Sequence, residues 1–160
     1  TGLYNRRIFQ RHLEKEIERA KRTKEPFTLA LIDVDKFKHI NDTLGHSAGD
    51  RVLISIAEVL RQTVRKADVV CRLGGDEFLI LLPGARKSHA EKLKERIVAE
   101  IAEACKKLGI DFSVSFGIYE SGAENAEEAL DFVDKRMYEE KGKKGERYVL
   151  DVERNIGDIL

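Results

Sequence analysis

The sequence has no long apolar run, no excess of either charge and only two cysteines. None of its apolar stretches approaches the roughly 20 residues of a membrane-spanning helix, and no secretory signal peptide is visible. The 29 basic residues balance the 29 acidic ones, so the chain as a whole is not drawn to nucleic acid or to a membrane surface. Cys71 and Cys105 lack metal-ligand spacing, which indicates reduced thiols. We therefore expect a cytoplasmic domain that contacts neither nucleic acid nor membrane, although its parent protein can be membrane-anchored.

Periodic apolar patterns predict a sheet with helices packed against it. Helical spacing predicts helices over residues 6–24, 50–64, 89–107 and 125–141. Ser88 with Glu91, and Asn125 with Glu128, are predicted to cap the last two helices. Strands are predicted over residues 27–33, 111–119 and 148–150, with a hairpin over 69–82. From the first strand on, the order βααββαβαβ is typical of an α/β (α+β) palm, a mostly antiparallel sheet surrounded by helices.

The predicted hairpin carries two adjacent acids. Gly74 and Gly75 lie between two apolar runs and predict a tight turn, which places Asp76 and Glu77 at the turn or just past it. Carboxylates held at a strand end suit a divalent metal, and a metal suits phosphate chemistry. Since Gly-Gly-Asp also occurs in ordinary hairpins, this stretch alone leaves the metal site open.

A second pair of acids follows the most apolar strand. Residues 27–32 read as a central strand buried on both faces, and Asp33 and Asp35 come directly after it. Aspartate is a poor strand former, so either the strand has emerged into water or the carboxylates share a metal with Asp76. For Asp33 we favour the metal, because it follows Ile32 without a break. For Asp35 emergence into water explains the sequence at least as well.

Five segments occur in a fixed order along the chain, at residues 1–7, 33–46, 49–50, 74–78 and 113–118. Together they resemble the GGDEF domain of bacterial diguanylate cyclases, over nearly the whole chain. The resemblance implies a nucleotidyl-cyclase-like fold and one GGDEF domain over residues 1–160. Because the chain begins inside a family motif, we expect it to be a fragment of a longer signalling protein.

The resemblance also implies a reaction. Members of the family join two GTP molecules into cyclic di-GMP and release two pyrophosphates, with Mg²⁺ or Mn²⁺ activating the attacking hydroxyl and neutralising phosphate charge. Each domain is implied to present one GTP, so that a homodimer is needed for catalysis. One alternative is a catalytically weak module that binds GTP or cyclic di-GMP as a receptor. Another is a different nucleotidyl transferase on the same palm, against which the guanine-reading residues named below argue.

The implied metal ligands are Asp33, the carbonyl of Val34, Asp76 and Glu77, where Glu77 either holds a second ion or stabilises the site. The implied catalytic residues are Asp76, Glu77 and Lys38. Asp76 is the family's presumed proton acceptor, but a metal-bound carboxylate is a weak base. Lys38 would neutralise charge on the transferred phosphate; its alternative is an ordinary surface lysine.

The implied substrate-binding residues are Phe37, Lys38, Asn41, His46, Asp50, Gly74, Gly75 and Lys141. Backbone amides near residues 36 and 37, at the entry to a helix, can cradle phosphates. Asn41 and Asp50 match the guanine-reading pair. Their alternatives are a helix N-cap for Asn41 and a charge in the first turn of a helix for Asp50. His46 matches a substrate contact but is equally compatible with a structural role.

The C-terminal part departs from the family. Lys141 matches the residue that reaches the β- and γ-phosphates. The Gly-Arg-Asn that usually follows is absent, and Glu146 stands where an arginine is expected. Whether Arg147, Lys143 or Lys144 replaces that arginine is left open by the sequence.

Arg65 and Asp68 form an Arg-x-x-Asp motif at the family's spacing before Gly74. The resemblance implies an inhibitory site for the product, where arginine pairs with phosphate or guanine and aspartate accepts from guanine. Arg96 is a candidate second contact. The alternative is an ordinary charge cluster at the end of a helix.

Overall fold

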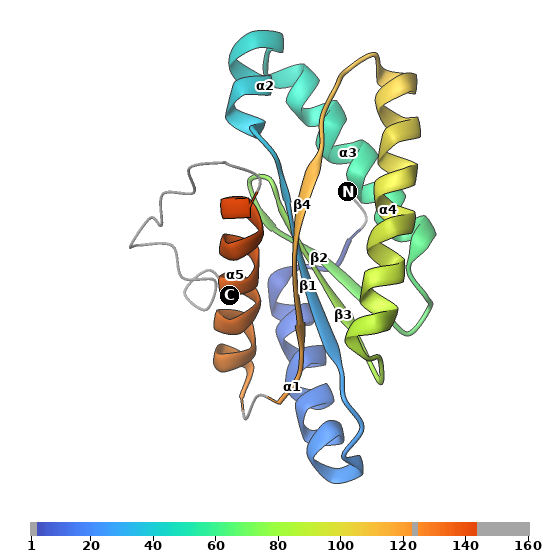
Figure 1. Ribbon diagram of the computed structural model, residues 1–160, viewed down its shortest axis with the longest axis vertical. Helices are drawn as coiled ribbons and strands as arrows, with labels where there is room; N and C mark the ends of the chain where they lie inside the picture. The colour runs from blue at the N-terminus through green and yellow to red at the C-terminus, as the bar shows by residue number, and fades with distance from the viewer. Residues whose placement is uncertain (1–2, 123–124, 144–160) are drawn as a thin grey trace.

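The computed structural model describes residues 3–122 and 125–143. Its four strands form one sheet in the order β2-β3-β1-β4, and every neighbouring pair is antiparallel (Figure 1). The strands are β1 (Thr28–Val34), β2 (Val69–Gly74), β3 (Glu77–Leu82) and β4 (Val114–Glu120). The antiparallel sheet with helices around it confirms the predicted α+β palm.

Helices cover both faces of the sheet. They are α1 (Arg6–Thr23), α2 (Phe37–Leu44), α3 (His46–Thr63), α4 (Lys87–Leu108) and α5 (Ala126–Lys143). One apolar cluster joins the sheet to α3 and α4, and the other joins its opposite face to α1 and α5 (Figure 1). Along β1, Ala30 and Ile32 belong to the first cluster while Leu29 and Leu31 belong to the second. The strand is therefore buried on both faces, as its apolar run predicts.

Helix α5 lies directly on β4 because Gly117 has no side chain. A Cβ atom at this position would lie 2.5 Å from the backbone nitrogen of Met137 and 2.6 Å from the carbonyl oxygen of Val133. Such distances leave no room for any other residue. The close approach sets the height of α5 above the sheet, and with it the position of Lys141, one turn beyond Met137.

Two predicted helix starts differ from the structure. The predicted cap at Ser88 is wrong, because α4 begins at Lys87 and has no side-chain cap. The Lys87 amide instead donates to Glu120 Oε1, at 2.7 Å, so a tertiary contact replaces the local cap. Helix α3 begins at His46 rather than at residue 50. The prediction missed its first turn because the buried residues there, Ala48 and Gly49, are small and give no apolar pattern. The cap at Asn125 is confirmed by its hydrogen bond from the Glu128 amide at 2.9 Å.

The strand ends also shift slightly. The predicted strand over 111–119 begins only at Val114, because its partner β1 ends at Val34, opposite that residue. The hairpin turn is Gly75-Asp76, one position later than predicted, because Gly74 still pairs with Glu77. The predicted strand over 148–150 lies outside the described residues. Within the described part, no helix has both the length and the apolar character to cross a membrane.

Candidate metal and nucleotide site

Three carboxylates meet where β1 ends and β3 begins. The pairing register of the two strands sets Asp33 opposite Glu77, and Asp76 lies in the turn just before β3. One carboxylate oxygen from each lies within 4.8 Å of the others. The Val34 amide donates to the Asp76 carbonyl at 3.2 Å, which ties the turn to the end of β1. The two acidic motifs of the sequence thus form one cluster.

This cluster is largely withdrawn from water. Asp33 is 3% exposed and Glu77 is 6% exposed, whereas Asp76 is half-buried. The pKa of Asp33 is raised to about 7: burial is the largest cause, the adjacent Asp76 adds to the rise, and Lys141 opposes both. Asp33 Oδ1 is buried without a hydrogen-bond partner among the described residues. Buried anionic oxygens are costly unless a cation or a donor meets them.

The cluster fits a divalent cation. Mg²⁺ and Mn²⁺ prefer oxygen ligands, and this site offers carboxylate oxygens from Asp33, Asp76 and Glu77 at one point. The buried Oδ1 of Asp33 is an available ligand atom. The fit supports the metal explanation chosen for Asp33 from the sequence. The carbonyl of Val34 as a further ligand stays a prediction.

Lys141 lies inside this cluster. Its side chain is 7% exposed, and its Nζ atom is 2.8 Å from Asp33 Oδ2 and 4.0 Å from Asp35 Oδ1. Helix α5 covers the face of the sheet that Leu29 and Leu31 share, and Asp33, two positions beyond Leu31, points to the same face. From the sequence, Lys141 was predicted to bind the β- and γ-phosphates. Its contact with Asp33, a predicted metal ligand, was not predicted.

Asp35 has a different place from the one expected. It is 7% exposed, so the explanation that the strand has emerged into water is wrong. The hydroxyls of Ser113 and Ser115 donate to its two carboxylate oxygens at 2.6 Å and 2.5 Å. Its own amide donates to the Ser113 carbonyl at 2.9 Å. Asp35 therefore fastens the end of β1 to the start of β4, a role that the two serines on the polar face of the predicted strand over 111–119 could have indicated.

An arginine that the sequence did not single out holds the turn. Arg72 donates from Nε and Nη2 to the Gly75 carbonyl, at 3.1 Å and 2.7 Å. Gly75 has φ 53°, in the left-handed region that favours glycine. Because Gly74 and Gly75 are exposed and carry no side chain, a ligand can approach the backbone next to Asp76. The contact of Gly74 and Gly75 with substrate stays a prediction, and their exposed backbone is compatible with it.

The predicted guanine readers lie on two packed helices at the end of the sheet beyond β1 (Figure 1). Asn41 is inside α2 and its carbonyl accepts from the Gly45 amide, so the N-cap alternative is wrong. Asp50 is past the first turn of α3, so its first-turn alternative is also wrong. Asn41 packs against Gly49, where a Cβ atom would lie 1.9 Å from Asn41 Oδ1. The Asn41 amide therefore lies against Gly49, the residue that precedes Asp50 in α3.

The remaining predicted nucleotide contacts surround these two helices. Phe37 is the first residue of α2 and is half-buried, and Lys36 before it adopts the left-handed conformation, with φ 52°. The predicted helix entry at residues 36 and 37 is confirmed, and phosphate binding by its amides stays a prediction. Lys38 and His46 are exposed on α2 and at the start of α3. Of the lysines considered for the missing arginine, Lys143 is exposed in the last turn of α5, and Lys144 and Arg147 lie outside the described residues.

Arg65 and Asp68 already engage each other. Arg65 Nη2 lies 2.9 Å from Asp68 Oδ1, and the Arg65 amide donates to Asp68 Oδ2 at 2.7 Å. The same guanidinium donates to the Pro83 carbonyl at 3.2 Å. Arg96 is exposed on α4 and makes no hydrogen bond or ion pair with any described residue. These contacts fit a helix-ending charge cluster as well as a product site, which stays a prediction.

This pair is remote from the carboxylates. Arg65 lies before β2 and contacts the turn after β3, whereas Asp76 is at the other end of the same hairpin. Six residues of strand separate the two ends, which is roughly 20 Å at about 3.3 Å per residue. Any effect of one site on the other therefore passes along the hairpin or between molecules.

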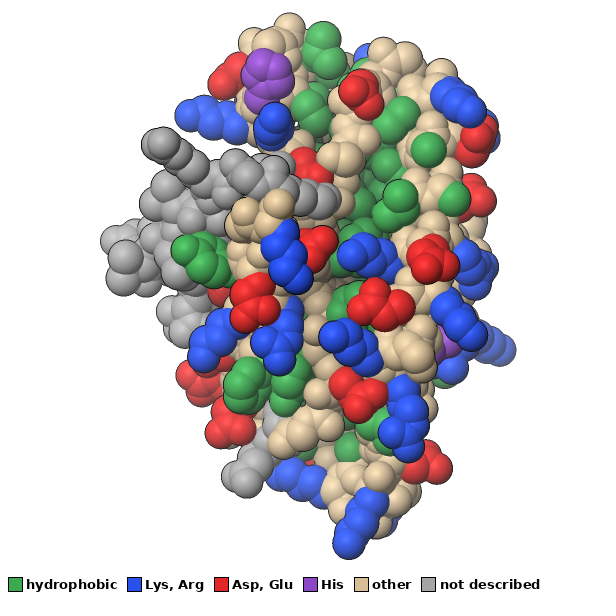
Figure 2. Space-filling model, in the orientation of Figure 1, with side chains coloured by type: hydrophobic (Ala, Val, Ile, Leu, Met, Phe, Trp, Pro, Cys, Tyr) green, Lys and Arg blue, Asp and Glu red, His purple; other side chains and the backbone are tan. Residues whose placement is uncertain are grey.

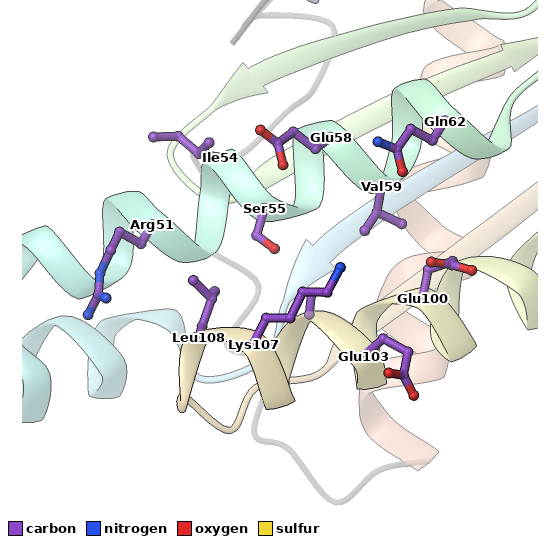
Figure 3. Close-up of a pocket in the computed structure, with 11 residues that line it drawn as sticks. Arg51, Ile54, Ser55, Glu58, Val59, Gln62, Glu100, Glu103, Lys107 and Leu108 are labelled. Carbon is purple, nitrogen blue, oxygen red and sulfur yellow. The ribbon is translucent and has the colours of Figure 1, made fainter.

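One hollow among the described residues is separate from the carboxylates. A hollow of about 300 Å³ between α3 and α4 is lined by Ile54, Val59 and Leu108 with charged side chains around them (Figure 3). It lies on the opposite side of the sheet from Lys141. Figure 2 shows basic and acidic side chains interspersed over the visible face, in line with the balanced composition.

Comparison with known proteins identifies the family of the chain. The family described as "Diguanylate cyclase, GGDEF domain" matches residues 1–147. The diguanylate cyclase DgcP of Pseudomonas aeruginosa is 40% identical over 147 residues, which is 88% of this chain but 22% of that protein. The diguanylate cyclase DgcM of Escherichia coli is 39% identical over 142 residues, which is 88% of this chain and 35% of that protein. The chain thus spans about a third or less of these curated relatives.

Solved structures share the fold. The diguanylate cyclase SiaD of Pseudomonas aeruginosa, in complex with its activator SiaC, has a TM-score of 0.83 and 35% identity, over 89% of this chain and 56% of that one. The GGDEF domain of DgcB from Caulobacter crescentus, in complex with c-di-GMP, has a TM-score of 0.81 and 28% identity, over 91% of this chain and 89% of that one. The sequence motifs, the antiparallel palm and the acidic cluster agree with these matches, and the chain belongs to the GGDEF domain family.

Proposed function

We propose that this domain is a metal-dependent diguanylate cyclase, which converts two GTP molecules into cyclic di-GMP and two pyrophosphates. One observation carries the proposal: Asp33, Asp76 and Glu77 converge at the end of β1, with Asp33 Oδ1 buried and unsatisfied. The relatives named as diguanylate cyclases, and the cyclic di-GMP bound to DgcB, support it. We also propose that residues 1–160 act as one such domain.

A bound Mg²⁺ or Mn²⁺, held by Asp33, the Val34 carbonyl, Asp76 and Glu77, would acidify the attacking hydroxyl and neutralise phosphate charge. The 3′-oxygen of one GTP forms a bond to the α-phosphorus of the other, and the bond from that phosphorus to pyrophosphate breaks. The proton of the hydroxyl passes to a carboxylate of the cluster. Asp76 is the best placed of the three for this role, because it is half-buried while the other two are almost fully buried.

The nucleotide lies, in this proposal, between α2 and the hairpin turn. The amides at the start of α2 and the exposed Lys38 meet the phosphates. The Asp50 carboxylate accepts from the N1–H and N2–H₂ groups of guanine, and the Asn41 amide meets guanine N3 and N2. His46, the first residue of α3, is a further contact in this proposal. The exposed backbone of Gly74 and Gly75 faces the transferred phosphate.

Two domains must meet for one product molecule. Each chain carries one such set of metal and guanine residues, whereas the product contains two nucleotides. We propose a homodimer in which each copy presents one GTP. Arg65, Asp68 and Arg96 form a separate product site that slows the enzyme.

The test is to incubate the purified domain with GTP and Mg²⁺ and to identify the nucleotides formed. Cyclic di-GMP and pyrophosphate are expected, and Asp33→Asn should abolish their formation while circular dichroism shows the fold intact. The receptor alternative gives binding of GTP or cyclic di-GMP without turnover. Cyclic GMP as the product would instead indicate a nucleoside cyclase.

A further inference from the structure

A lysine side chain occupies the place of a cation in the acidic cluster. Lys141 is 5% exposed as a residue, and its Nζ atom contacts Asp33 Oδ2 at 2.8 Å. The other oxygen of the same carboxylate, Oδ1, is buried and has no hydrogen-bond partner among the described residues. A divalent cation on Oδ1 would therefore share one carboxylate with the ammonium group. Two cations bound to the two oxygens of one carboxylate repel each other strongly in a buried site, because solvent screens their charges little there.

The fold leaves the ammonium little freedom on this side of the sheet. Gly117 lets the backbone of α5 rest on β4, and Lys141 follows Met137, the residue at that contact, by one turn. Asp35 Oδ1 lies 4.0 Å from Nζ and is fixed by the hydroxyls of Ser113 and Ser115. The lysine is thus placed between two buried carboxylates, one of which is a candidate metal ligand.

We propose that Lys141 is a tethered counter-cation, which neutralises Asp33 in the nucleotide-free protein and weakens binding of a free divalent cation until nucleotide phosphates draw the ammonium away. The proposal rests on the metal-dependent function proposed above. It gives Lys141 two positions: on Asp33 without nucleotide, and on the phosphates with it. Metal and nucleotide then enter together, because the phosphates remove the competitor and supply further oxygen ligands for the metal.

The deciding experiment measures Mn²⁺ binding without nucleotide, by the electron paramagnetic resonance signal of free Mn²⁺ at pH 8. The variants are Lys141→Met, the matched control Lys135→Met on the exposed side of α5, and Asp33→Asn. Lys141→Met is expected to bind Mn²⁺ roughly tenfold more tightly than the parent, since loss of one charged contact is worth about one decade in affinity. Lys135→Met should match the parent. A non-hydrolysable GTP analogue should tighten Mn²⁺ binding in the parent far more than in Lys141→Met.

Equal or weaker Mn²⁺ binding by a folded Lys141→Met overturns the inference. If Asp33→Asn still abolishes binding in that case, the metal site and the proposed function stand. If neither the parent nor Lys141→Met binds Mn²⁺, the inference and the metal site fail together. Should Lys141→Met not fold, the rate of chemical acetylation of Lys141 in the parent, with and without Mn²⁺, is measured instead, with Lys135 as the internal reference. Increased labelling of Lys141 at saturating Mn²⁺ supports the inference, and unchanged protection overturns it.

Discussion

Gly49→Ala should impair the use of GTP while hardly changing stability. The new methyl group would lie 1.9 Å from Asn41 Oδ1 and 3.2 Å from Phe37 Cζ, so the Asn41 amide must turn away. Gly49 lies within α3 and its φ is not positive, so alanine there gains about 0.8–1.0 kcal/mol of helix propensity. That gain offsets much of the cost of moving one short side chain, and the free energy of unfolding should change by less than about 1 kcal/mol.

The loss should fall on guanine recognition instead. A displaced Asn41 leaves a hydrogen-bonding group of guanine unpaired, which costs roughly 1–3 kcal/mol, or about a 5- to 150-fold weaker affinity for GTP. Calorimetric titration with a GTP analogue and thermal unfolding measure the two effects separately.

A double-mutant cycle with Asn41→Ala tests whether Gly49→Ala weakens GTP binding by displacing the Asn41 amide. If Gly49→Ala acts through Asn41, it should have little further effect on GTP binding once the amide is gone. Additive losses, or normal GTP affinity in a folded Gly49→Ala, would refute the reasoning.

Further predictions concern packing, protonation and inhibition. Gly117→Ala should cost roughly 3 kcal/mol of stability by overpacking α5 on β4, measured by urea unfolding, whereas Gly122→Ala, with nothing within 4 Å of its new methyl, should cost little. In the metal-free protein, Asp33 should make the free energy of unfolding fall as pH rises from about 4 to about 7, because the native state keeps a proton that the unfolded chain releases; a parent slope equal to that of Asp33→Asn would contradict this. Arg65→Ala should keep its initial rate but resist inhibition by added cyclic di-GMP. The control Lys66→Ala, which changes an exposed residue, should be inhibited like the parent. Equal cyclic di-GMP affinity of the parent and Arg65→Ala would exclude Arg65 from a product site.

Local sequence patterns were sufficient to predict the elements whose structure depends on the burial of their own apolar residues. The apolar run before Asp33 predicted a central strand, and the alternation around Val114 predicted which side chains of β4 share one apolar face. The start of α4 was missed because its amide is capped by Glu120, a residue 33 positions away. A sequence pattern within one helix carries no trace of such a partner.

The members of the acidic cluster were predictable from the sequence, whereas its ion pair with Lys141 was not. Asp33 and Asp76 were assigned to one metal from the motifs alone, and strand pairing brings them together. The contact of Lys141 with Asp33 depends on which face of β1 the aspartate takes and on how closely α5 approaches at Gly117. The periodicity of β1 gives the face that Asp33 shares with Leu29 and Leu31, but not which helix covers that face, so this ion pair depends on tertiary packing.

The β2–β3 hairpin offers a route between the two predicted sites. At one end, Arg65 donates to the Pro83 carbonyl, and the next residue, Gly84, donates its amide to the buried Glu16 of α1 at 3.1 Å. At the other end, Arg72 holds the turn that carries Asp76.

A ligand that recruits the Arg65 guanidinium must replace its bonds to Asp68 and Pro83, and this exchange is the differential interaction that any coupling requires. If the hairpin transmits inhibition, cyclic di-GMP should alter hydrogen exchange at Gly75 and Asp76 even in monomeric protein. If cyclic di-GMP inhibits only by holding two domains apart, hydrogen exchange at the turn should stay constant in the monomer. Inhibition would then come from the loss of contact between the two domains. Exchange measured at concentrations that favour monomer therefore separates the two routes, and an unchanged turn would exclude the hairpin as the carrier.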